Sequence, residues 1–354
     1  MRLAARAAGR SDVGLHRQTN EDSWVVRPFL FAVADGMGGA KAGEVASRVA
    51  IQTLVEHLPR LAEADEEAAG AELAAAAEDA NARVYALSVE HRSQAGMGTT
   101  LTVLLLTEQG ARVAHIGDSR AYVLRDGILE QVTDDHSLVG EMVRNGEISL
   151  EEAAGHPLRS VLSRALGTEP EVEIDLLEVD VRAGDTLLLC SDGLSGVVPH
   201  DKLAELAGED SPGGAAERLV KAALALGGPD NITALVIRLE EATDASSAQA
   251  AAESAAAVAQ SEDVDAAGEA PDEAPSRPPA PAGVSGPKSG ETAGPGAAEE
   301  GAGTGSRSDD GDEAGEPALL AEAASAALEP AADSGEAAGR RRGWWRLRRR
   351  DRGR

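Results

Sequence analysis

The most informative stretch of this chain reads Phe29-Leu30-Phe31-Ala32-Val33-Ala34-Asp35-Gly36-Met37-Gly38-Gly39. A short apolar run of large and branched side chains, bounded by a turn signal, predicts a buried β-strand. The run ends at Asp35, and the glycine that follows allows a sharp backbone turn and leaves space beside the chain. The sequence therefore predicts a carboxylate at the end of a buried strand.

The same arrangement occurs twice more. Residues 111–116 form an apolar run that leads to Asp118, and residues 186–190 form one that leads to Asp192. Ionised carboxylates that are buried together lose solvation and repel one another unless cations neutralise them. Because the candidate ligands are oxygen atoms, without Cys or paired His, they favour Mg²⁺ or Mn²⁺ over Zn²⁺ or copper. We therefore expect a divalent-cation site where these strand ends meet.

Six short segments follow one another in this order: Arg17-Gln18-Thr19-Asn20-Glu21-Asp22, the turn at Asp35, Gly98-Thr99-Thr100, Gly117-Asp118-Ser119-Arg120, Ser191-Asp192-Gly193-Leu194 and Asp230-Asn231-Ile232-Thr233. This ordered set resembles the metal-dependent protein phosphatases of type 2C, in particular their bacterial serine/threonine branch, over about residues 9–239. Each segment alone is a weak signal, whereas the ordered set is specific.

The resemblance implies a role for each matched residue. Asp35 would bridge two metal ions, and the Gly36 carbonyl would bind one of them. Asp192 and Asp230 would complete the other ion's ligands, and Glu21 would hold metal-bound water. The expected cofactor is Mn²⁺ or Mg²⁺, as two ions with a third in a weaker site.

Further matched residues would bind the third ion, hold substrate or support the ligands. Asp118, together with Asp192, matches the family's residues for the third ion. Arg17 matches the arginine that holds the substrate phosphate, a role suited to a planar, permanently charged group. Asp22 and Asn231 are expected to support the metal ligands, with Asp22 orienting them rather than binding metal.

The implied chemistry needs no nucleophilic side chain. Two cations about 3.5 to 4 Å apart lower the pKa of a bridging water, clamp phosphate oxygens and stabilise an in-line displacement. We therefore expect no phosphoenzyme, and the single cysteine, Cys190, is interpreted as a buried small hydrophobe. Met37 stands where eukaryotic members usually place a proposed general-acid His, so the proton donor is unassigned and metal-bound water is our preferred candidate. Structural roles are expected for His115, His136 and His156.

Residues 137–167 interrupt the strand pattern and predict a mobile flap beside the active site, similar to that of bacterial family members. Residues 138–145 have a helical pattern that ends at Gly146, and Ser149 with Glu152 forms a capping-box signal for a second helix. Three residues there are candidates for substrate contact, although solvated surface is the preferred interpretation of each: Arg159, Ser160 and Arg164.

Strands and helices come in groups rather than as repeating βαβ units, which argues for mainly antiparallel sheets with helices outside. Apolar spacing predicts helices near residues 42–54 and 73–87. N-cap chemistry predicts two more, at Asp201 and at Ser211 before Pro212. Further strands are expected at residues 103–106, 121–124, 176–179 and 234–237, with a hairpin turn at 125–127.

We therefore predict an α+β fold followed by a disordered tail. The family resemblance implies a four-layer αββα sandwich, two mainly antiparallel β-sheets flanked by helix pairs, over residues 9–239. Residues 240–339 consist mainly of Ala, Glu, Asp, Gly, Ser and Pro, which cannot offset the entropy lost on ordering. We expect a disordered acidic linker there, followed by a basic segment at residues 340–354.

Charge divides along the same boundary. The 354-residue chain has a net charge of −28; residues 241–339 contain 21 acidic and 3 basic residues, and residues 340–354 contain nine arginines and one aspartate. The first 240 residues therefore carry −18. This acidity argues against nucleic acid as a partner.

The basic segment at residues 340–354 combines arginine with two tryptophans. It suits an anionic membrane surface, where each basic residue contributes about 1 kcal/mol. Docking on acidic parts of the chain, and the absence of a specific role, remain alternatives. Because there is no apolar run of about 20 residues and no signal core near Met1, we expect a cytoplasmic protein with peripheral contact to the inner membrane face.

The expected function is hydrolysis of phosphoserine and phosphothreonine in proteins by a metal-activated water. The enzyme, expected to be a monomer, would oppose bacterial serine/threonine kinases, which are themselves candidate substrates. Three alternatives remain: a phosphatase of one regulatory protein in a partner-switch pathway, a small-molecule phosphatase, and an inactive binding module. The last would normally lack Asp35, Asp192 or Asp230, and all three are present.

Overall fold

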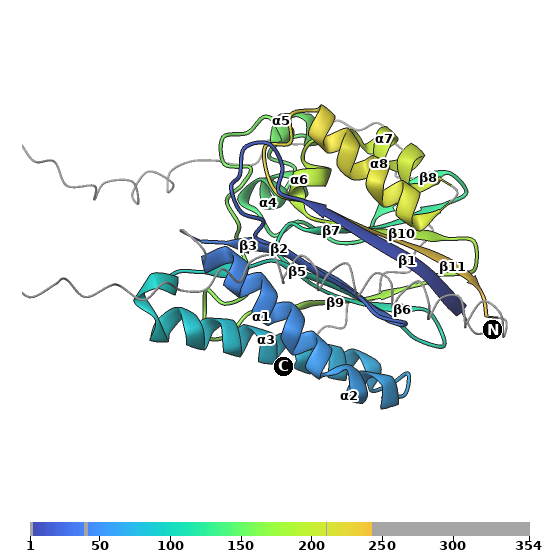
Figure 1. Ribbon diagram of the computed structural model, residues 1–354, viewed down its shortest axis with the longest axis horizontal. Helices are drawn as coiled ribbons and strands as arrows, with labels where there is room; N and C mark the ends of the chain where they lie inside the picture. Colours follow the sequence, from blue (N-terminus) through green and yellow to red (C-terminus); the bar gives the residue numbers. More distant parts are fainter. Residues whose placement is uncertain (1–2, 39–41, 210, 243–354) are drawn as a thin grey trace, which may run out of the picture. The chain divides into compact units, whose positions relative to one another are not determined.

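The computed structural model describes residues 3–38, 42–209 and 211–242. Within these residues, two β-sheets pack face to face and helices cover their outer faces (Figure 1). Every pair of neighbouring strands in the described part of the chain is antiparallel. The α+β class and the αββα layer order are therefore confirmed.

Each sheet has an order that differs from the sequence order. The first sheet runs β1 (Leu3–Asp12), β11 (Ile232–Glu241), β10 (Thr186–Cys190), β7 (Arg120–Arg125) and β8 (Ile128–Gln131). The second runs β2 (Asp22–Val26), β3 (Leu30–Met37), β5 (Leu101–Leu106), β6 (Ala111–Ile116) and β9 (Asp175–Val179), with β4 (Gly98–Thr99) paired to β3. Strands β1 and β11 pair along their whole length, so the first and last described strands lie side by side.

The apolar runs form strands that are buried on both faces. In β3, Leu30 and Ala32 contribute to the core under the helices of the second sheet, whereas Phe31 and Val33 contribute to the core between the sheets. Successive side chains of a strand point to opposite faces. An uninterrupted apolar run is therefore what a strand between two cores requires.

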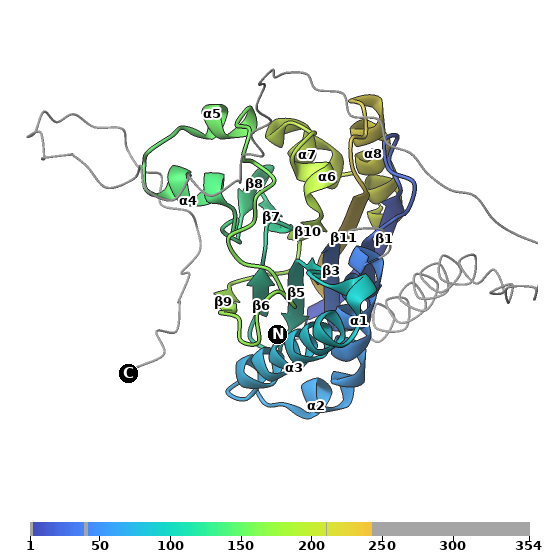
Figure 2. The ribbon, with the colours of Figure 1, turned by 90° about the vertical axis from the view of Figure 1, so that its left-hand side faces the viewer.

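Helices form the two outer layers (Figures 1 and 2). On the side of the second sheet lie α1 (Ala42–Glu56), α2 (Leu58–Glu63) and α3 (Ala69–Glu90), followed by a 3-10 helix (Arg92–Gln94). On the side of the first sheet lie α6 (Asp192–Ser195), α7 (His200–Ala207) and α8 (Pro212–Ala225). The flap helices α4 (Leu138–Arg144) and α5 (Leu150–Ala154) lie to one side of the sheets (Figure 2). None of the helices in the described residues is long and apolar enough to cross a membrane.

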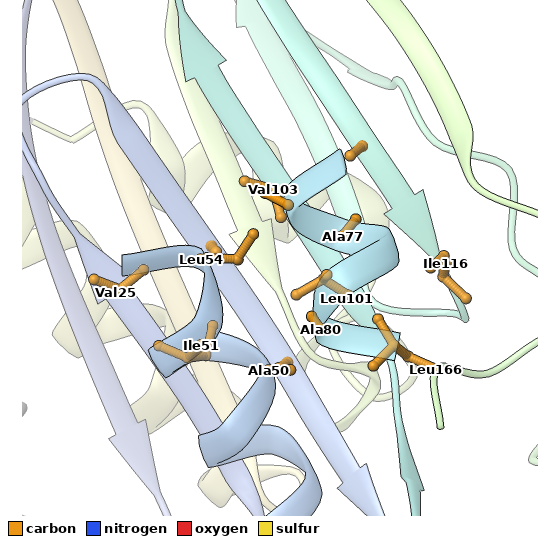
Figure 3. Packing of buried hydrophobic residues seen from close by; sticks show 14 of the residues in the cluster. Val25, Ala50, Ile51, Leu54, Ala77, Ala80, Leu101, Val103, Ile116 and Leu166 are labelled. Carbon is orange, nitrogen blue, oxygen red and sulfur yellow. The ribbon is translucent and has the colours of Figure 1, made fainter. Parts of the chain in front are cut away.

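Small side chains let the outer helices approach the second sheet closely. Ala50 of α1 and Ala77 and Ala80 of α3 are completely buried, and Leu54 fills the space between α1 and the strands (Figure 3). A large aliphatic side chain that is fully buried contributes about 1.5 to 3 kcal/mol to folding. The alanine-rich helix pattern therefore reflects close packing rather than a binding surface.

Most predicted elements are confirmed, and the differences are local. Strands β6 and β10 occupy the predicted residues, and Ser211 caps α8 by accepting a bond from the Gly214 N–H at 3.2 Å. The helix predicted at Asp201 is present as α7, but Asp201 lies in its first turn rather than at the N-cap, because α7 begins at His200 with Pro199 in the N-cap position. Strands β1 and β2 and the short α6 were not predicted.

The predicted linker and basic segment lie almost entirely outside the described residues. Glu240 and Glu241, placed at the start of the linker region from composition, belong to β11 instead. Strand pairing with β1 continues to Glu241, opposite Leu3. The folded region therefore extends at least to this residue.

Candidate active site

Asp22 and Asp35 meet on the face of the second sheet that looks toward the first. They are register partners in β2 and β3. Asp35 continues the alternation of Phe31 and Val33, whose side chains lie in the core between the sheets. Like charges directly opposite each other destabilise a strand pair unless they are neutralised. The strand ends therefore hold two carboxyl groups between the sheets.

Two hydroxyl groups tie Asp22 to the first sheet. Ser191 Oγ, just after β10, donates to Asp22 Oδ2 at 2.7 Å, and Thr233 Oγ1 of β11 donates to the same oxygen at 2.6 Å. The other oxygen, Oδ1, is buried and has no hydrogen-bond partner among the residues that the structure describes. Asp22 thus joins the two sheets, and one of its buried oxygens remains available to a ligand.

Asp192 and Asp230 come from the first sheet. Asp192 is the first residue of α6, after β10, and Asp230 lies two residues before β11. Burial and the negative charge of Asp230 raise the pKa of Asp192, whereas hydrogen bonding with Asp35 lowers it. Carboxyl groups from both sheets therefore interact across the gap between the strand ends.

In the folded protein without metal, ionising all carboxyl groups of the cluster would cost considerable free energy. Burial raises the pKa of Asp22 to about 7, that of Asp118 to about 8, and that of Asp35 well above its ordinary value. In each case the charge of Asp192 raises the pKa further. These groups hold protons at a pH where ordinary carboxyls are ionised, and a cation would bind by displacing them.

The donor set fits a hard divalent cation that keeps part of its water. In the part of the chain that the structure describes, no three acidic, His or Cys side chains by themselves form a metal-binding group. Mg²⁺ typically binds through one or two carboxylates and retains several waters, and Mn²⁺ accepts the same oxygen ligands. The clustered carboxyls match that requirement, and the unpaired Asp22 Oδ1 could accept a hydrogen bond from such a water.

Asn231 fixes the loop that carries Arg17 and Glu21. Its Oδ1 accepts a bond from the Glu21 N–H at 2.8 Å. Its Nδ2 donates to the carbonyls of Val13 at 2.9 Å and Thr19 at 3.0 Å. One buried amide therefore holds both ends of this loop against the start of β11.

Arg17 reaches the edge of the acidic cluster. Its Nη2 donates to Asp230 Oδ2 at 2.8 Å, and its Nη1 lies 3.8 Å from Glu21 Oε2. The bond to Asp230 raises the pKa of Arg17. Burial raises the pKa of Glu21, although the Arg17 charge opposes this. Because the Arg17 side chain is 47% exposed, other guanidinium donors still face solvent.

Two threonines, for which no role was predicted, hold the main chain of Asp35. The Asp35 N–H donates to Thr100 Oγ1 at 2.9 Å, and the Asp35 carbonyl accepts from Thr99 Oγ1 at 2.9 Å and from the Thr100 N–H at 2.8 Å. The only sequence signal for them was their place in the Gly98-Thr99-Thr100 segment. Ser47 of α1 likewise supports the site by donating to the Glu21 carbonyl at 2.6 Å.

Gly36 is required for a different reason from the one predicted. It lies inside β3 rather than in a turn. A Cβ at this position would collide with the Gly43 carbonyl in the first turn of α1 and would lie 2.6 Å from the Glu21 carbonyl oxygen. Glycine therefore allows the helix and the loop to pack directly on the backbone next to Asp35.

The predicted flap residues differ in their surroundings. Arg159 and Ser160 are exposed. Arg164 is half-buried, and its Nη1 donates to Asp175 Oδ1 at 2.9 Å and to the Glu173 carbonyl at 3.2 Å. Arg164 thus anchors the returning arm of the flap. The predicted capping box of Ser149 and Glu152 is present at the start of α5.

Cys190 has no place in the chemistry of the site. It is completely buried in β10, and burial raises the pKa of its thiol to about 12. A thiol of this kind is not ionised at neutral pH and makes a poor nucleophile. Its interpretation as a buried small hydrophobe is confirmed.

An acidic cluster between the ends of two antiparallel sheets, with helices outside, is the architecture of the αββα metal-dependent phosphatases. The chain belongs to the family described as Protein phosphatase 2C, whose profile matches residues 12–225. The serine/threonine protein phosphatase PstP of Mycobacterium tuberculosis is 46% identical over 237 residues, which cover 66% of this chain and 45% of that protein. The serine/threonine phosphatase stp of Listeria monocytogenes is 39% identical over 238 residues, covering 64% of this chain and 93% of that protein.

Solved structures show the same likeness. The catalytic domain of PstP in complex with two manganese ions superimposes with a TM-score of 0.63 at 41% identity, covering 68% of this chain and all of that one. Stp1 from Staphylococcus aureus gives a TM-score of 0.63 at 34% identity, covering 67% of this chain and 97% of that one. The aligned part spans less than half the length of full PstP, whereas it spans nearly all of the Listeria phosphatase.

Proposed function

We propose that this chain is a Mn²⁺- or Mg²⁺-dependent phosphatase that removes phosphate from phosphoserine and phosphothreonine in proteins. The observation that carries the proposal is the acidic cluster between the sheets, in which burial raises the pKa of Asp22, Asp35 and Asp118. When bound, divalent cations would relieve that cost, activate a water and neutralise charge on the phosphate. The printed names of the relatives, serine/threonine phosphatases, support this substrate class.

Each of the two sheets would supply some of the metal ligands. From the second sheet, Asp35 would serve both principal ions and the Gly36 carbonyl would serve one of them. From the first sheet, Asp192 and Asp230 would serve the other. Glu21, whose main chain is held by Asn231, would hold a water on the ions. These assignments follow the order of the sequence motifs. They are supported by the position of Asp35 near the end of β3 and of Asp192 just after β10.

Two further residues complete the assignment. Asp118, together with Asp192, would bind a third, weaker ion, and the charge of Asp192 already raises the pKa of Asp118. Arg17 would bind the substrate phosphate, because its exposed guanidinium sits at the edge of the cluster while Asp230 holds it in place. A permanently charged fork suits a phosphate monoester at that position.

The flap favours a protein as the substrate over a small molecule. Large apolar side chains are exposed on and beside its helices, namely Leu138, Leu150, Leu158 and Val161. A small phosphate ester would not cover such a surface, whereas a protein could bury it. Serine/threonine kinases, or one regulatory protein of a partner-switch pathway, are the candidate phosphoproteins.

Substrate competition tests this proposal. Purified full-length chain is assayed with a phosphothreonine peptide, a phosphothreonine protein and a panel of sugar and nucleoside monophosphates, with Mn²⁺, with Mg²⁺ and with excess chelator. We expect activity on the peptide and the protein that needs either cation and vanishes with chelator. Faster turnover of a small monophosphate would instead support the small-molecule alternative.

We further propose a cytoplasmic monomer that touches the inner membrane face through residues 340–354. Support comes from the sequence alone, in which arginines surround two tryptophans. Co-sedimentation of the full chain with anionic and with neutral vesicles tests the membrane contact, with Trp344→Ala and Trp345→Ala combined as the comparison. Binding to anionic vesicles that this double change weakens is expected; equal recovery with both lipids would contradict the proposal.

A further inference from the structure

His136 is a completely buried histidine that the proposed chemistry does not use. It lies just before α4, at the point where the chain leaves the first sheet for the flap, and no part of it is exposed. Its main chain and its ring contact three segments that are distant in sequence. A buried side chain with such contacts can affect catalysis by positioning the residues that it contacts.

The first contact is with the turn that carries Asp118. The Gly117 N–H donates to His136 Nδ1 at 3.1 Å, and the His136 N–H donates to the Gly117 carbonyl at 2.8 Å. Gly117 has φ of +102°, and a Cβ there would lie 2.6 Å from the Thr100 Cβ. The turn therefore has little room to shift, and His136 holds the peptide that precedes Asp118.

This contact fixes the tautomer of the ring. Because Nδ1 accepts a hydrogen bond, it carries no proton, and the neutral ring has its proton on Nε2. Nε2 lies 3.5 Å from Asp175 Oδ2 in β9, an ion-pair contact, and has no hydrogen-bond partner in the described part of the chain. Burial alone would raise the pKa of Asp175, but His136 and Arg164 outweigh this and hold it below the usual range. The ring therefore presents an N–H to an ionised carboxylate.

The same carboxylate holds the returning arm of the flap. Asp175 Oδ1 accepts a bond from Arg164 Nη1 at 2.9 Å. The main chain adds a second link, because the Ser163 N–H donates to the His136 carbonyl at 2.9 Å. His136, at the start of the flap, thus contacts the returning arm, β9 and the Asp118 turn together.

We propose that His136 is a positioning residue that links the base of the flap to the Asp118 turn. Its Nδ1 sets the backbone position of Asp118, and its Nε2–H, through Asp175, sets the position of Arg164 and the returning arm. The inference rests on the proposed phosphatase function for its kinetic consequences. Its structural part, the link between ring and flap, does not depend on that function.

Asparagine and glutamine separate the two ring nitrogens. The amide of Asn reaches about the position of Nδ1, and that of Gln, one carbon longer, reaches about the position of Nε2. His136→Asn should keep an acceptor for the Gly117 N–H and lose the contact with Asp175. His136→Gln should keep a donor toward Asp175 and leave the Gly117 N–H unsatisfied.

The kinetic expectation is a split between the two variants. His136→Gln should lower kcat about 10-fold on both a small aryl phosphate and a phosphothreonine peptide, the scale of effect seen when groups that orient a ligand are lost. His136→Asn and Asp175→Asn should keep kcat on the aryl phosphate within about 2-fold and raise KM for the peptide about 10-fold.

A second readout needs neither metal nor turnover. Trypsin can cleave after Arg159, which is exposed in the flap. In excess chelator, His136→Asn and Asp175→Asn should be cleaved there several-fold faster than wild type, because the returning arm is released, whereas His136→Gln should not. If turnover is absent altogether, this readout still tests the link, so failure of the proposed function and failure of the inference are distinguishable.

His57 provides a matched control on the outer helices. Its Nε2 lies 3.0 Å from Asp79 Oδ2, so it forms a His–Asp pair of the same kind after the C-terminal end of α1. The N-terminal end of α1 lies beside the active site, and the helix of 15 residues separates the two by about 22 Å. His57→Asn and His57→Gln should leave cleavage at Arg159 and both kinetic constants unchanged.

Equal behaviour would overturn the proposal. If His136→Asn and His136→Gln lose activity and gain cleavage in the same proportion, the ring only fills space. Should neither variant fold by circular dichroism, Asp175→Asn decides the matter. Unchanged cleavage at Arg159 together with an unchanged KM for the peptide would then contradict the link.

Discussion

At the scale of single residues, the acidic cluster makes the metal-free protein sensitive to pH. Burial raises the pKa of Asp22 to about 7 and that of Asp118 to about 8, whereas an unfolded Asp titrates at about 3.9. A carboxyl whose pKa is raised by folding stabilises the fold while protonated. That stabilisation decreases as the pH rises toward the folded-state pKa.

His115, another buried group, makes stability depend on pH in the opposite direction at lower pH. Burial lowers the pKa of His115 to about 3, whereas an unfolded His titrates at about 6.5. Folding therefore excludes a proton from His115 below this pH, and stability due to His115 rises with pH up to about 6.5. Well above pH 6.5 His115 is neutral in both states and no longer contributes to the slope, whereas the carboxyl cluster still does.

We therefore expect the thermal midpoint of chelator-treated protein to fall between about pH 6.5 and pH 8. Asp118→Asn, which cannot ionise, should show a shallower fall, and saturating Mn²⁺ should raise the midpoint most at the higher pH. Scanning calorimetry across this interval is the measurement. A midpoint that rises with pH in the metal-free protein would contradict the assigned shifts.

The candidate ligands could be predicted from sequence because each follows a recognisable strand or belongs to an ordered motif. The bonds that hold them could not. The Glu21 N–H bonds to Asn231 Oδ1 across 210 positions, and Thr100 Oγ1 accepts from the Asp35 N–H across 65. Such contacts depend on which strands become neighbours, and no local pattern encodes that.

At the scale of elements, continuous apolar runs were good predictors and alanine-rich strands were poor ones. Strand β1 consists mainly of Ala, Arg and Gly and has no β-branched residue, and only its Ala5 and Ala7 are buried. Alanine has low β-propensity, so the local sequence gives little sign of a strand. Ten paired positions with β11 nevertheless fix it in the sheet.

Helix capping gives a test at this scale. Ser211 caps α8, which buries Leu219 and Val220 against the first sheet, so Ser211→Ala should lower the free energy of unfolding by about 1 kcal/mol. Ser149 caps α5, which has no fully buried residue, so Ser149→Ala should leave global stability within about 0.5 kcal/mol.

Urea denaturation of both variants measures the difference. Ser149→Ala serves as the matched control, since the same hydroxyl is removed from an equivalent cap position. Equal losses of stability in the two variants would show that the cap energies do not follow the packing of the helices.

At the scale of the whole molecule, the site exists only when both sheets are assembled. Asp22 and Asp35 belong to the second sheet, while Ser191 and Thr233, which bond to Asp22, belong to the first. The sequence predicted the layers and the strand ends. The face-to-face contact that brings these four residues together could be predicted only through the family resemblance.

The charge distribution along the chain gives a further prediction. Residues 340–354 are strongly basic and lie far in sequence from the described catalytic region. Deleting them should leave kcat and KM for a small aryl phosphate unchanged, because none of the proposed ligands belongs to them. Steady-state kinetics of the truncated and full chains is the test, and a several-fold fall in activity would show that the segment regulates the enzyme.

A calorimetric titration of Mn²⁺ into protein freed of metal by chelator, and then freed of chelator, tests the metal site most directly. It is carried out on the wild type, Asp35→Asn and Asp118→Asn. We expect two tight sites in the wild type, with proton release on binding. Asp35→Asn should lose tight binding and peptide hydrolysis together. Asp118→Asn should keep both tight sites while turnover falls. Tight Mn²⁺ binding that is equal in the wild type and Asp35→Asn would contradict the central claim that the carboxyl cluster between the sheets is the metal site.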